Sequence, residues 1–302
     1  MRVIVLTDSS PRHYHFARSI CSSSNVVGVF TGAKSANTST FNRIRRELKS
    51  AERISKFILK RFYDIQYRKY LHLLGTQQRD AEKRHFDNSQ ALFKKEFGEL
   101  ETKVDPSIGS INSKVYIGQI ASLRPDIIVV MGTCLIGKEL MKAAPLMLNL
   151  HTGLSPWYRG GSTNLWPFLF KDYGYFGVTI HIMHSSIDGG SIVYHGIPTI
   201  DATDSFPSIN AKAIVIGTEL MKAAINDYQN DKLASVDQTF SGKLFHNIDL
   251  HGYHIKRYIE NQQDFFSMVN WEKIRYPVGL VLNTEVQDRL SVAQKSKLLS
   301  NN

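Results

Sequence analysis

Four short apolar runs, separated by stretches of helical character, constrain the fold of this chain more than any other feature. They lie at residues 2–7, 25–32, 126–133 and 146–151. Runs of this length and composition are typical of strands buried on both faces of a parallel sheet, which is covered by its own crossover helices. We therefore predict an α/β fold with a Rossmann-like, mostly parallel sheet and helices on both faces.

The second half of the chain adds an antiparallel pair and a long helix. Residues 162–170 predict a short helix, and 176–184 alternate like a strand that pairs with 191–200 across a turn. A helix is expected over 206–231, with Pro207 near its start. Beyond it only 236–245 is strand-like. We predict a catalytic domain over 1–205, with a helical insertion at about 33–110, and a helix plus C-terminal extension over 206–302.

The net charge of +10 is concentrated in one segment. Residues 41–95 contain fifteen Lys or Arg against six Asp or Glu. Residues 38–74 contain no Pro or Gly, and their apolar residues recur at helical spacing, which predicts a helix, paired with 78–98 in a hairpin; that stripe comprises Ile54, Phe57, Ile58, Phe62 and Ile65. A solvated basic face is the simplest interpretation; nucleic acid or an anionic membrane surface remains an alternative partner.

Composition excludes several other classes. No apolar run reaches the roughly 18 residues of a membrane span, and the apolar stretch near Met1 is too short for a signal peptide. Cys21 and Cys134 give neither a disulfide framework nor metal-ligand spacing, so no metal is expected. We expect a cytoplasmic protein. The turn after the first strand lacks the glycine pattern of dinucleotide binding, which disfavours an oxidoreductase.

Polar residues end the fourth apolar run, where ligands of parallel sheets bind. Asn149 and His151 are two positions apart and so project to the same side of a strand, and Asp188 follows in a glycine-flanked loop. An amide donor, an imidazole and an orienting carboxylate are the groups that acyl transfer needs. No Ser or Cys stands in an obvious nucleophile position, so we expect direct attack by the acceptor.

At these residues the sequence resembles the folate-dependent formyltransferases, which include the glycinamide ribonucleotide, methionyl-tRNA and sugar N-formyltransferases. The resemblance lies in Asn149-Leu150-His151, in the loop from Leu154 to Gly160, in the strand from Gly177 to His181, and in Asp188-Gly189-Gly190. It covers about 115–200 and extends to 1–31. It implies the formyltransferase type of α/β fold.

The resemblance further implies transfer of a formyl group from 10-formyltetrahydrofolate to an amine. Asn149 and a protonated His151 are expected to stabilise the oxyanion, with Asp188 holding His151 and His181 in a supporting role. The folate is expected to bind along two segments, 131–137 and 183–188, through Met131, Gly132, Cys134, Leu135, Ile136, Met183 and Ile187.

The acceptor side is expected at the loops around the reacting groups, through Ser10, Arg12, Trp157, Tyr158, Arg159 and Gly160. An amino sugar, nucleotide-linked, fits the chain length best among the family's acceptors. The alternatives are methionyl-tRNA, glycinamide ribonucleotide, a formyltetrahydrofolate deformylase, and a non-catalytic nucleic-acid-binding protein that uses 41–95. A deformylase is less expected because the first strand begins at Arg2, where such hydrolases carry a regulatory domain. A homodimer stays an open alternative to a monomer.

Overall fold

A seven-stranded sheet forms the centre of the protein in the computed structural model, which describes residues 1–33, 50–201, 203–268, 274–290 and 296. The strand order is β3-β2-β1-β4-β5-β7-β8. The strands are β1 (Val3–Thr7), β2 (Val26–Thr31), β3 (Glu101–Lys103), β4 (Ile127–Met131), β5 (Leu146–His151), β7 (Val178–Ile182) and β8 (Ile192–Gly196). The first five strands are parallel, and β7 and β8 are antiparallel additions, which confirms the predicted mostly parallel sheet.

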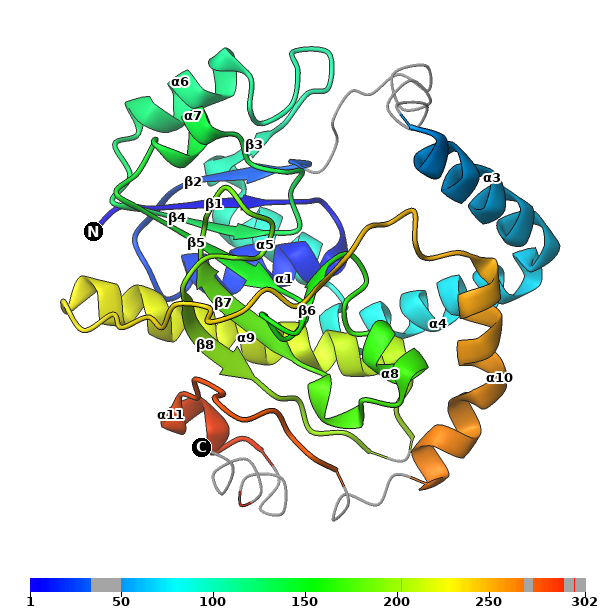
Figure 1. The fold of residues 1–302 in the computed structure, drawn as a ribbon. Helices are drawn as coiled ribbons and strands as arrows, with labels where there is room; N and C mark the ends of the chain where they lie inside the picture. The colour runs from blue at the N-terminus through cyan, green and yellow to red at the C-terminus, as the bar shows by residue number, and fades with distance from the viewer. Residues whose placement is uncertain (34–49, 202, 269–273, 291–295, 297–302) are drawn as a thin grey trace.

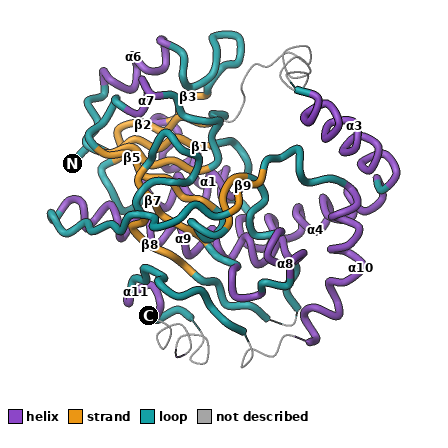
Figure 2. Tube along the Cα trace, viewed as in Figure 1, coloured by secondary structure: helices purple, strands orange, loops and turns teal. Residues whose placement is uncertain are grey.

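Helices cover both faces of this sheet (Figure 1). One face packs against α1 (Pro11–Cys21), α5 (Ser89–Phe97) and the long α9 (Phe206–Gln229), with Phe16, Phe93 and Leu220 in its core. The other packs against α6 (Lys114–Ser122) and the short α7 (Lys138–Met141). Figure 2 shows the strands enclosed between these helices. The buried apolar side chains alternate between the two faces, as the pleat of a strand requires.

The insertion differs from the predicted helix over 38–74 and its hairpin partner over 78–98, because its described residues form three helices, α3 (Ala51–Gln66), α4 (Arg68–Phe86) and α5. The helix α3 ends where α4 begins, and α4 continues through Gly75. The predicted start at 38 lies outside the described residues. None of the residues of α3 is buried, although its apolar stripe is regular. Among the described residues, α3 therefore packs against α4 and α10 (Gly252–Met268) along one side only.

The helix α10 lies beside α3 and α4 (Figure 1). The sequence did not predict this helix. Lys60 donates to the Leu250 carbonyl at 2.5 Å, and the Gly252 N–H donates to Asp64 at 2.8 Å. Gln77 donates to Gln262 at 2.9 Å. The insertion and the C-terminal region thus form one helical group.

The remaining short elements lie near the carboxyl end of β5. They are β6 (Tyr158–Gly160), α8 (Trp166–Phe170) and β9 (Lys243–Phe245), with a 3-10 turn at Tyr173–Tyr175. Elsewhere, a 3-10 turn at Gly98–Leu100 precedes β3, and α11 (Thr284–Gln287) packs against α9. The predicted helix over 162–170 is shorter than expected. Of the strand-like segment 236–245, only β9 forms a strand, and it pairs in parallel with β6.

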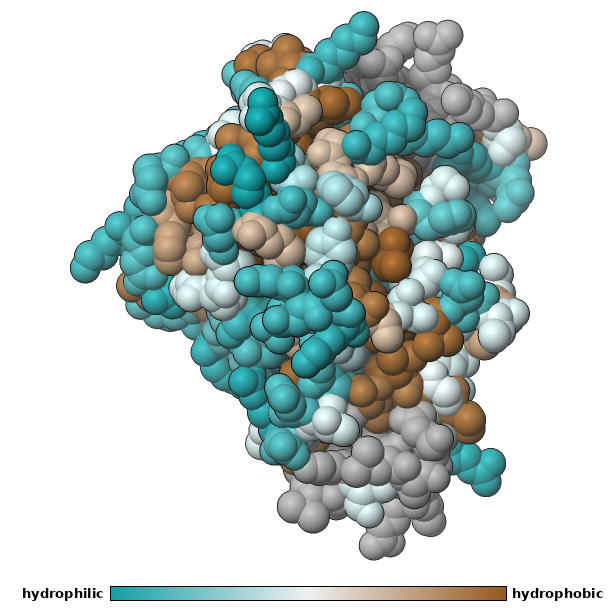
Figure 3. All heavy atoms as spheres, turned by 90° about the vertical axis from the view of Figure 1, so that its left-hand side faces the viewer, coloured by the Kyte–Doolittle hydropathy of each residue, from teal (hydrophilic) through white to brown (hydrophobic). Residues whose placement is uncertain are grey.

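Hydrophilic side chains dominate the face shown in Figure 3, with hydrophobic patches between them. No helix in the described part of the chain is both long enough and apolar enough to cross a membrane.

Candidate active site

The end of β5 places Asn149 and His151 on one side of the sheet, as their spacing predicts. β5 pairs with β7, which sets Asn149 opposite His181 and His151 opposite Thr179. Asn149 Nδ2 lies 3.0 Å from His181 Nε2. Because an amide nitrogen only donates, His181 Nε2 accepts, and the ring hydrogen sits on Nδ1, which donates to the Ile182 carbonyl at 2.9 Å. One amide hydrogen of Asn149 is thereby left for a ligand.

Asp188 reaches this strand end from the loop between β7 and β8. Its φ of 48° lies in the left-handed region, which Asp tolerates better than most residues. The next-but-one residue must be glycine, because a Cβ on Gly190 would lie 1.8 Å from the Ile182 carbonyl oxygen. The carboxylate lies 3.3 Å from His151 Nδ1 and 3.6 Å from His181 Nε2. It also accepts the Gly160 N–H at 2.8 Å.

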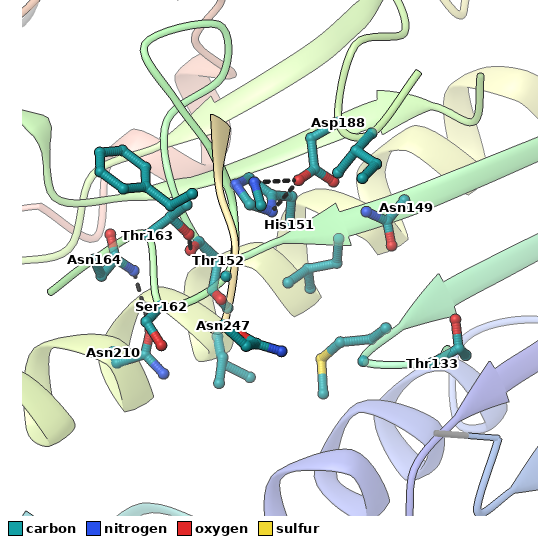
Figure 4. Close-up of a pocket in the computed structure, with 18 of the residues that line it drawn as sticks. Thr133, Asn149, His151, Thr152, Ser162, Thr163, Asn164, Asp188, Asn210 and Asn247 are labelled. Atoms are coloured by element: carbon teal, nitrogen blue, oxygen red, sulfur yellow. Dashed lines mark hydrogen bonds and ion pairs between the residues drawn. The ribbon is translucent and has the colours of Figure 1, made fainter. Parts of the chain in front are cut away.

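These contacts keep Asp188 ionised. Burial by itself raises the pKa of Asp188, but His151, His181 and the Gly160 N–H outweigh it and hold the pKa below its ordinary value. The structure thus brings together the three residues that the sequence predicts as catalytic, and Figure 4 shows them at one end of a shared cavity. Their catalytic roles remain predictions.

His151 is buried, and acceptors face both of its ring nitrogens. Nε2 donates to the Tyr158 carbonyl at 3.1 Å, and Nδ1 faces Asp188. Burial lowers the pKa of His151, while Asp188 opposes that effect only in part. Burial thus favours the neutral ring, whereas the acceptors at both nitrogens suit the protonated ring that the resemblance implies. A proton that arrives at Nδ1 would be stabilised at once by the carboxylate.

The cavity beside these residues has a volume of about 1250 Å³. Each of the seven residues expected to bind the folate lines it, as do His181, Arg12 and Gly160, while Leu135 exposes 73% of its surface at the rim. An apolar side chain held out in this way is available to cover a flat ring. Gly132 permits this loop to pass close to α1, since a Cβ there would lie 2.4 Å from His13 Nε2.

The structure places four of the expected acceptor residues away from the cavity lining. Trp157 packs against Tyr175 and His195, and the Tyr158 hydroxyl bonds to Asp172. Arg159 lies with its Nη1 toward the Gly189 backbone, and Ser10 bonds to His13 at 2.7 Å. Trp157, Tyr158 and Ser10 thus contact other parts of the protein, whereas Arg159 Nε is buried without a hydrogen-bond partner among the described residues. Contact with an acceptor would need that packing to change.

Sequence reasoning missed a second wall of the cavity. Neutral polar side chains gather there, as Figure 4 shows: Thr152, Ser162, Thr163, Asn164, Asn210 and Asn247. Asn164 donates to both the Gly177 carbonyl and Asn210 at 3.0 Å. Asn210, a polar residue in the first turns of the otherwise apolar helix 206–231, could have been predicted as a site residue. Nothing in the local sequence around Asn247 indicated such a role. Arg53, Gln78 and Glu82 also line the cavity, from the insertion.

Within the described residues, no group of three or more His, Cys, Asp or Glu side chains could hold a metal ion. The groups that the site itself offers are an amide donor, an imidazole–carboxylate pair and a partly apolar cleft.

A mostly parallel α/β sheet with these groups at the end of its fifth strand defines a Rossmann-like protein of the formyltransferase type. Residues 78–225, just under half of the chain, match the family model described as formyl transferase, so this segment carries that family's domain. The methionyl-tRNA formyltransferase of a Nitratiruptor species is 30% identical over 135 residues, which cover 43% of this chain and 44% of that protein. The chain thus spans less than half of the length of this relative.

Solved structures share the fold over more of the chain. A 4-N formyltransferase from Francisella tularensis gives a TM-score of 0.51 at 19% identity, covering 82% of this chain and 77% of that one. A sugar N-formyltransferase from a Shewanella species gives a TM-score of 0.50 at 17% identity, covering 82% and 78%. The fold likeness therefore includes the insertion or the C-terminal region in part, beyond the segment that the family model matches.

Proposed function

We propose that this chain transfers a formyl group from 10-formyltetrahydrofolate to the amine of a nucleotide-linked amino sugar. The observation that carries the proposal is the convergence of Asn149, His151 and Asp188 on one cavity within the matched family segment. We also propose that the protein is located in the cytoplasm, because Cys21 and Cys134 form no disulfide.

The residues support direct transfer. The amine nitrogen bonds to the formyl carbon, and the carbonyl electron pair moves to oxygen. The remaining hydrogen of Asn149 Nδ2 donates to that oxyanion, the interaction that lowers the barrier most in acyl transfer. The proton lost by the amine is held between His151 Nδ1 and Asp188, 3.3 Å apart, and returns to the folate nitrogen as the carbon–nitrogen bond breaks. The products are a formamide and tetrahydrofolate.

Two features support the donor site. The loop from Met131 to Ile136 leaves β4 along one edge of the cavity, and Met183 and Ile187 lie along another. Backbone groups of these loops can bind the polar edge of a pterin, while Leu135 covers its face. A pterin ring would fit this part of the cavity because exposed apolar side chains there lie beside backbone polar groups.

The amino-sugar acceptor is supported by the neutral polar wall. Amides and hydroxyls such as Asn210, Asn247 and Ser162 match the hydroxyl groups of a sugar, which both donate and accept hydrogen bonds. Arg12 and Arg53 line the same cavity and could meet an anionic carrier, although Arg12 is paired with Glu82. The cavity is bounded by residues of α4 and of the segment 244–250, which favours a small acceptor over a large one.

The test supplies 10-formyltetrahydrofolate with a panel of nucleotide-linked amino sugars and measures tetrahydrofolate and the formamide product. We expect release of tetrahydrofolate that depends on the acceptor. His151→Ala should lower kcat by about 10²- to 10³-fold, as removal of a group that stabilises the transition state does.

The matched control is His72→Ala, because His72 is an exposed histidine of α4 that does not line the cavity. It should keep most of its activity. Release of formate without any acceptor would contradict transfer and indicate a hydrolase. Formylation of methionyl-tRNA alone would contradict the sugar acceptor while leaving the reaction intact.

A further inference from the structure

The chain that follows α9 returns to the catalytic loop. Val236 and Ile192 exchange two backbone hydrogen bonds of 2.8 Å, and Ser191 donates to Asp237 at 2.5 Å. These contacts fix the chain against the start of β8, directly before Gln238. The next side chain therefore has a defined position beside the loop that carries Asp188.

Gln238 uses both of its amide hydrogens on that loop. Its Nε2 donates to the carbonyl oxygens of Asp188 and Gly190, each at 2.8 Å. The two carbonyls flank the turn in which Asp188 has its left-handed φ of 48°. A side chain from another part of the sequence thus holds a backbone conformation that the loop would otherwise leave readily.

A few residues later the same chain holds β6. β9 pairs with β6 so that Lys243 lies opposite Tyr158 and Phe245 lies opposite Gly160. The approach at Gly160 is close, since a Cβ there would lie 2.1 Å from the Phe245 carbonyl oxygen. Both ends of β6 form hydrogen bonds with the proposed catalytic residues. The Tyr158 carbonyl accepts from His151, and the Gly160 N–H donates to Asp188.

We propose that residues 236–245, here named the strap, set the distance between His151 and Asp188, with Gln238 as the positioning residue for the Asp188 turn. This inference rests on the proposed function for its effect on turnover. The strap lies beyond residues 78–225, which the family model matches, and Gln238 itself is not among the residues that line the cavity. It acts on the reaction through the Asp188 turn.

Gln238→Met tests the proposal in the full chain, because Met keeps the length of the side chain but donates no hydrogen bond. Without those donors the turn relaxes and the carboxylate moves away from His151. The imidazole then keeps its burial and its neighbours His181 and Arg159, which lower its pKa, but loses the carboxylate that raises it. We expect the His151 ring to titrate at lower pH, measured by NMR of labelled histidine without substrate.

Turnover should fall in parallel. A misplacement of this kind costs about 10- to 100-fold in kcat, with the KM for the formyl donor little changed because the donor segments are untouched. Gln238→Asn, whose amide is one methylene too short to reach both carbonyls, should give a smaller loss of kcat and the same direction of titration shift.

The matched control is Gln119→Met, the same substitution at an exposed glutamine of α6 that does not line the cavity. It should titrate and turn over like the unaltered protein. Unaltered titration and turnover in folded Gln238→Met would overturn the proposal, as would equal effects of Gln119→Met. If the unaltered protein transfers no formyl group, the proposed function fails, and the titration still decides the positioning role.

Discussion

His195 shows what a buried histidine does in this fold without any part in the chemistry. It lies on β8, where its Nε2 donates to the Ser155 carbonyl at 2.8 Å and its Nδ1 accepts the Val281 N–H at 3.0 Å. A ring that donates from one nitrogen and accepts at the other is neutral. Burial lowers the pKa of His195 to about 4, and the Ser155 carbonyl opposes this only in part.

We expect His195 to make the protein less stable in acid. Its folded pKa lies below the unfolded value of about 6.5, so the folded state binds fewer protons, and stability present above pH 6.5 is lost as the pH falls toward 4. A shift of this size corresponds to about 3 kcal/mol. The check is the free energy of urea unfolding between pH 7.5 and 4.

His195→Gln provides the comparison, because its amide can replace the donated hydrogen bond without titrating. Its unfolding free energy should fall less between the two pH values. An identical fall would contradict the assignment, since His151 and other buried groups titrate equally in both proteins.

Sequence reasoning succeeded at Asn149, His151 and Asp188 because their convergence depends on local spacing at the end of one strand and in one turn. It failed at Trp157 and Tyr158, where large aromatic side chains in a loop can serve a ligand or the loop's own packing, and only the tertiary neighbours decide. Gln238 and Asn247 carried no signal, since their partners lie about 50 residues or more away in sequence.

At the scale of elements, α3 shows that a periodic apolar pattern does not by itself mean that the side chains are buried. Its apolar stripe is as regular as that of a core helix, yet Phe62 exposes 59% of its surface and Ile65 68%. Periodicity shows that side chains share a face, but not that another element covers it. The helix α10 escaped prediction for the opposite reason, because its sequence is mixed and its partners, α3 and α4, are distant in sequence.

Two matched substitutions measure this difference. Phe93 on α5 is fully buried against Tyr14, so Phe93→Ala should cost about 3–5 kcal/mol of unfolding free energy. Phe62→Ala on α3 should change it by no more than about 0.5 kcal/mol. Chemical unfolding measures both. A large cost for Phe62→Ala would mean that a further surface covers the outer side of α3.

At the scale of the whole molecule, the predicted architecture is confirmed where apolar runs are long enough to pair by themselves. Strand β3 lies inside the predicted helical insertion and was not expected, but β1, β2, β4, β5 and the antiparallel pair β7 and β8 follow the sequence closely. The closure of the cavity does not, because its far wall combines the insertion with residues 244–250. Such a wall depends on contacts between distant segments, which no local pattern encodes.

Binding of the folate should stabilise the whole fold. Tetrahydrofolate at about 100 times its Kd should add about 2.7 kcal/mol and raise the melting temperature. Leu135→Asp should abolish much of that gain and leave the melting temperature of the ligand-free protein nearly unchanged, because the Leu135 side chain is already exposed. Thermal unfolding with and without ligand checks both. Equal gains in the two proteins would exclude Leu135 from the folate site.

The position of the strap after α9 has a consequence for synthesis. Residues 1–229 already contain every strand of the main sheet and all three groups at its active end. A chain still attached to the ribosome can form that sheet, since N-terminal segments fold first. Under the proposed role of the strap, the chain would not hold Asp188 beside His151 until Phe245 has emerged and β9 has paired with β6. We therefore expect a nascent chain to gain activity only after those residues have been made.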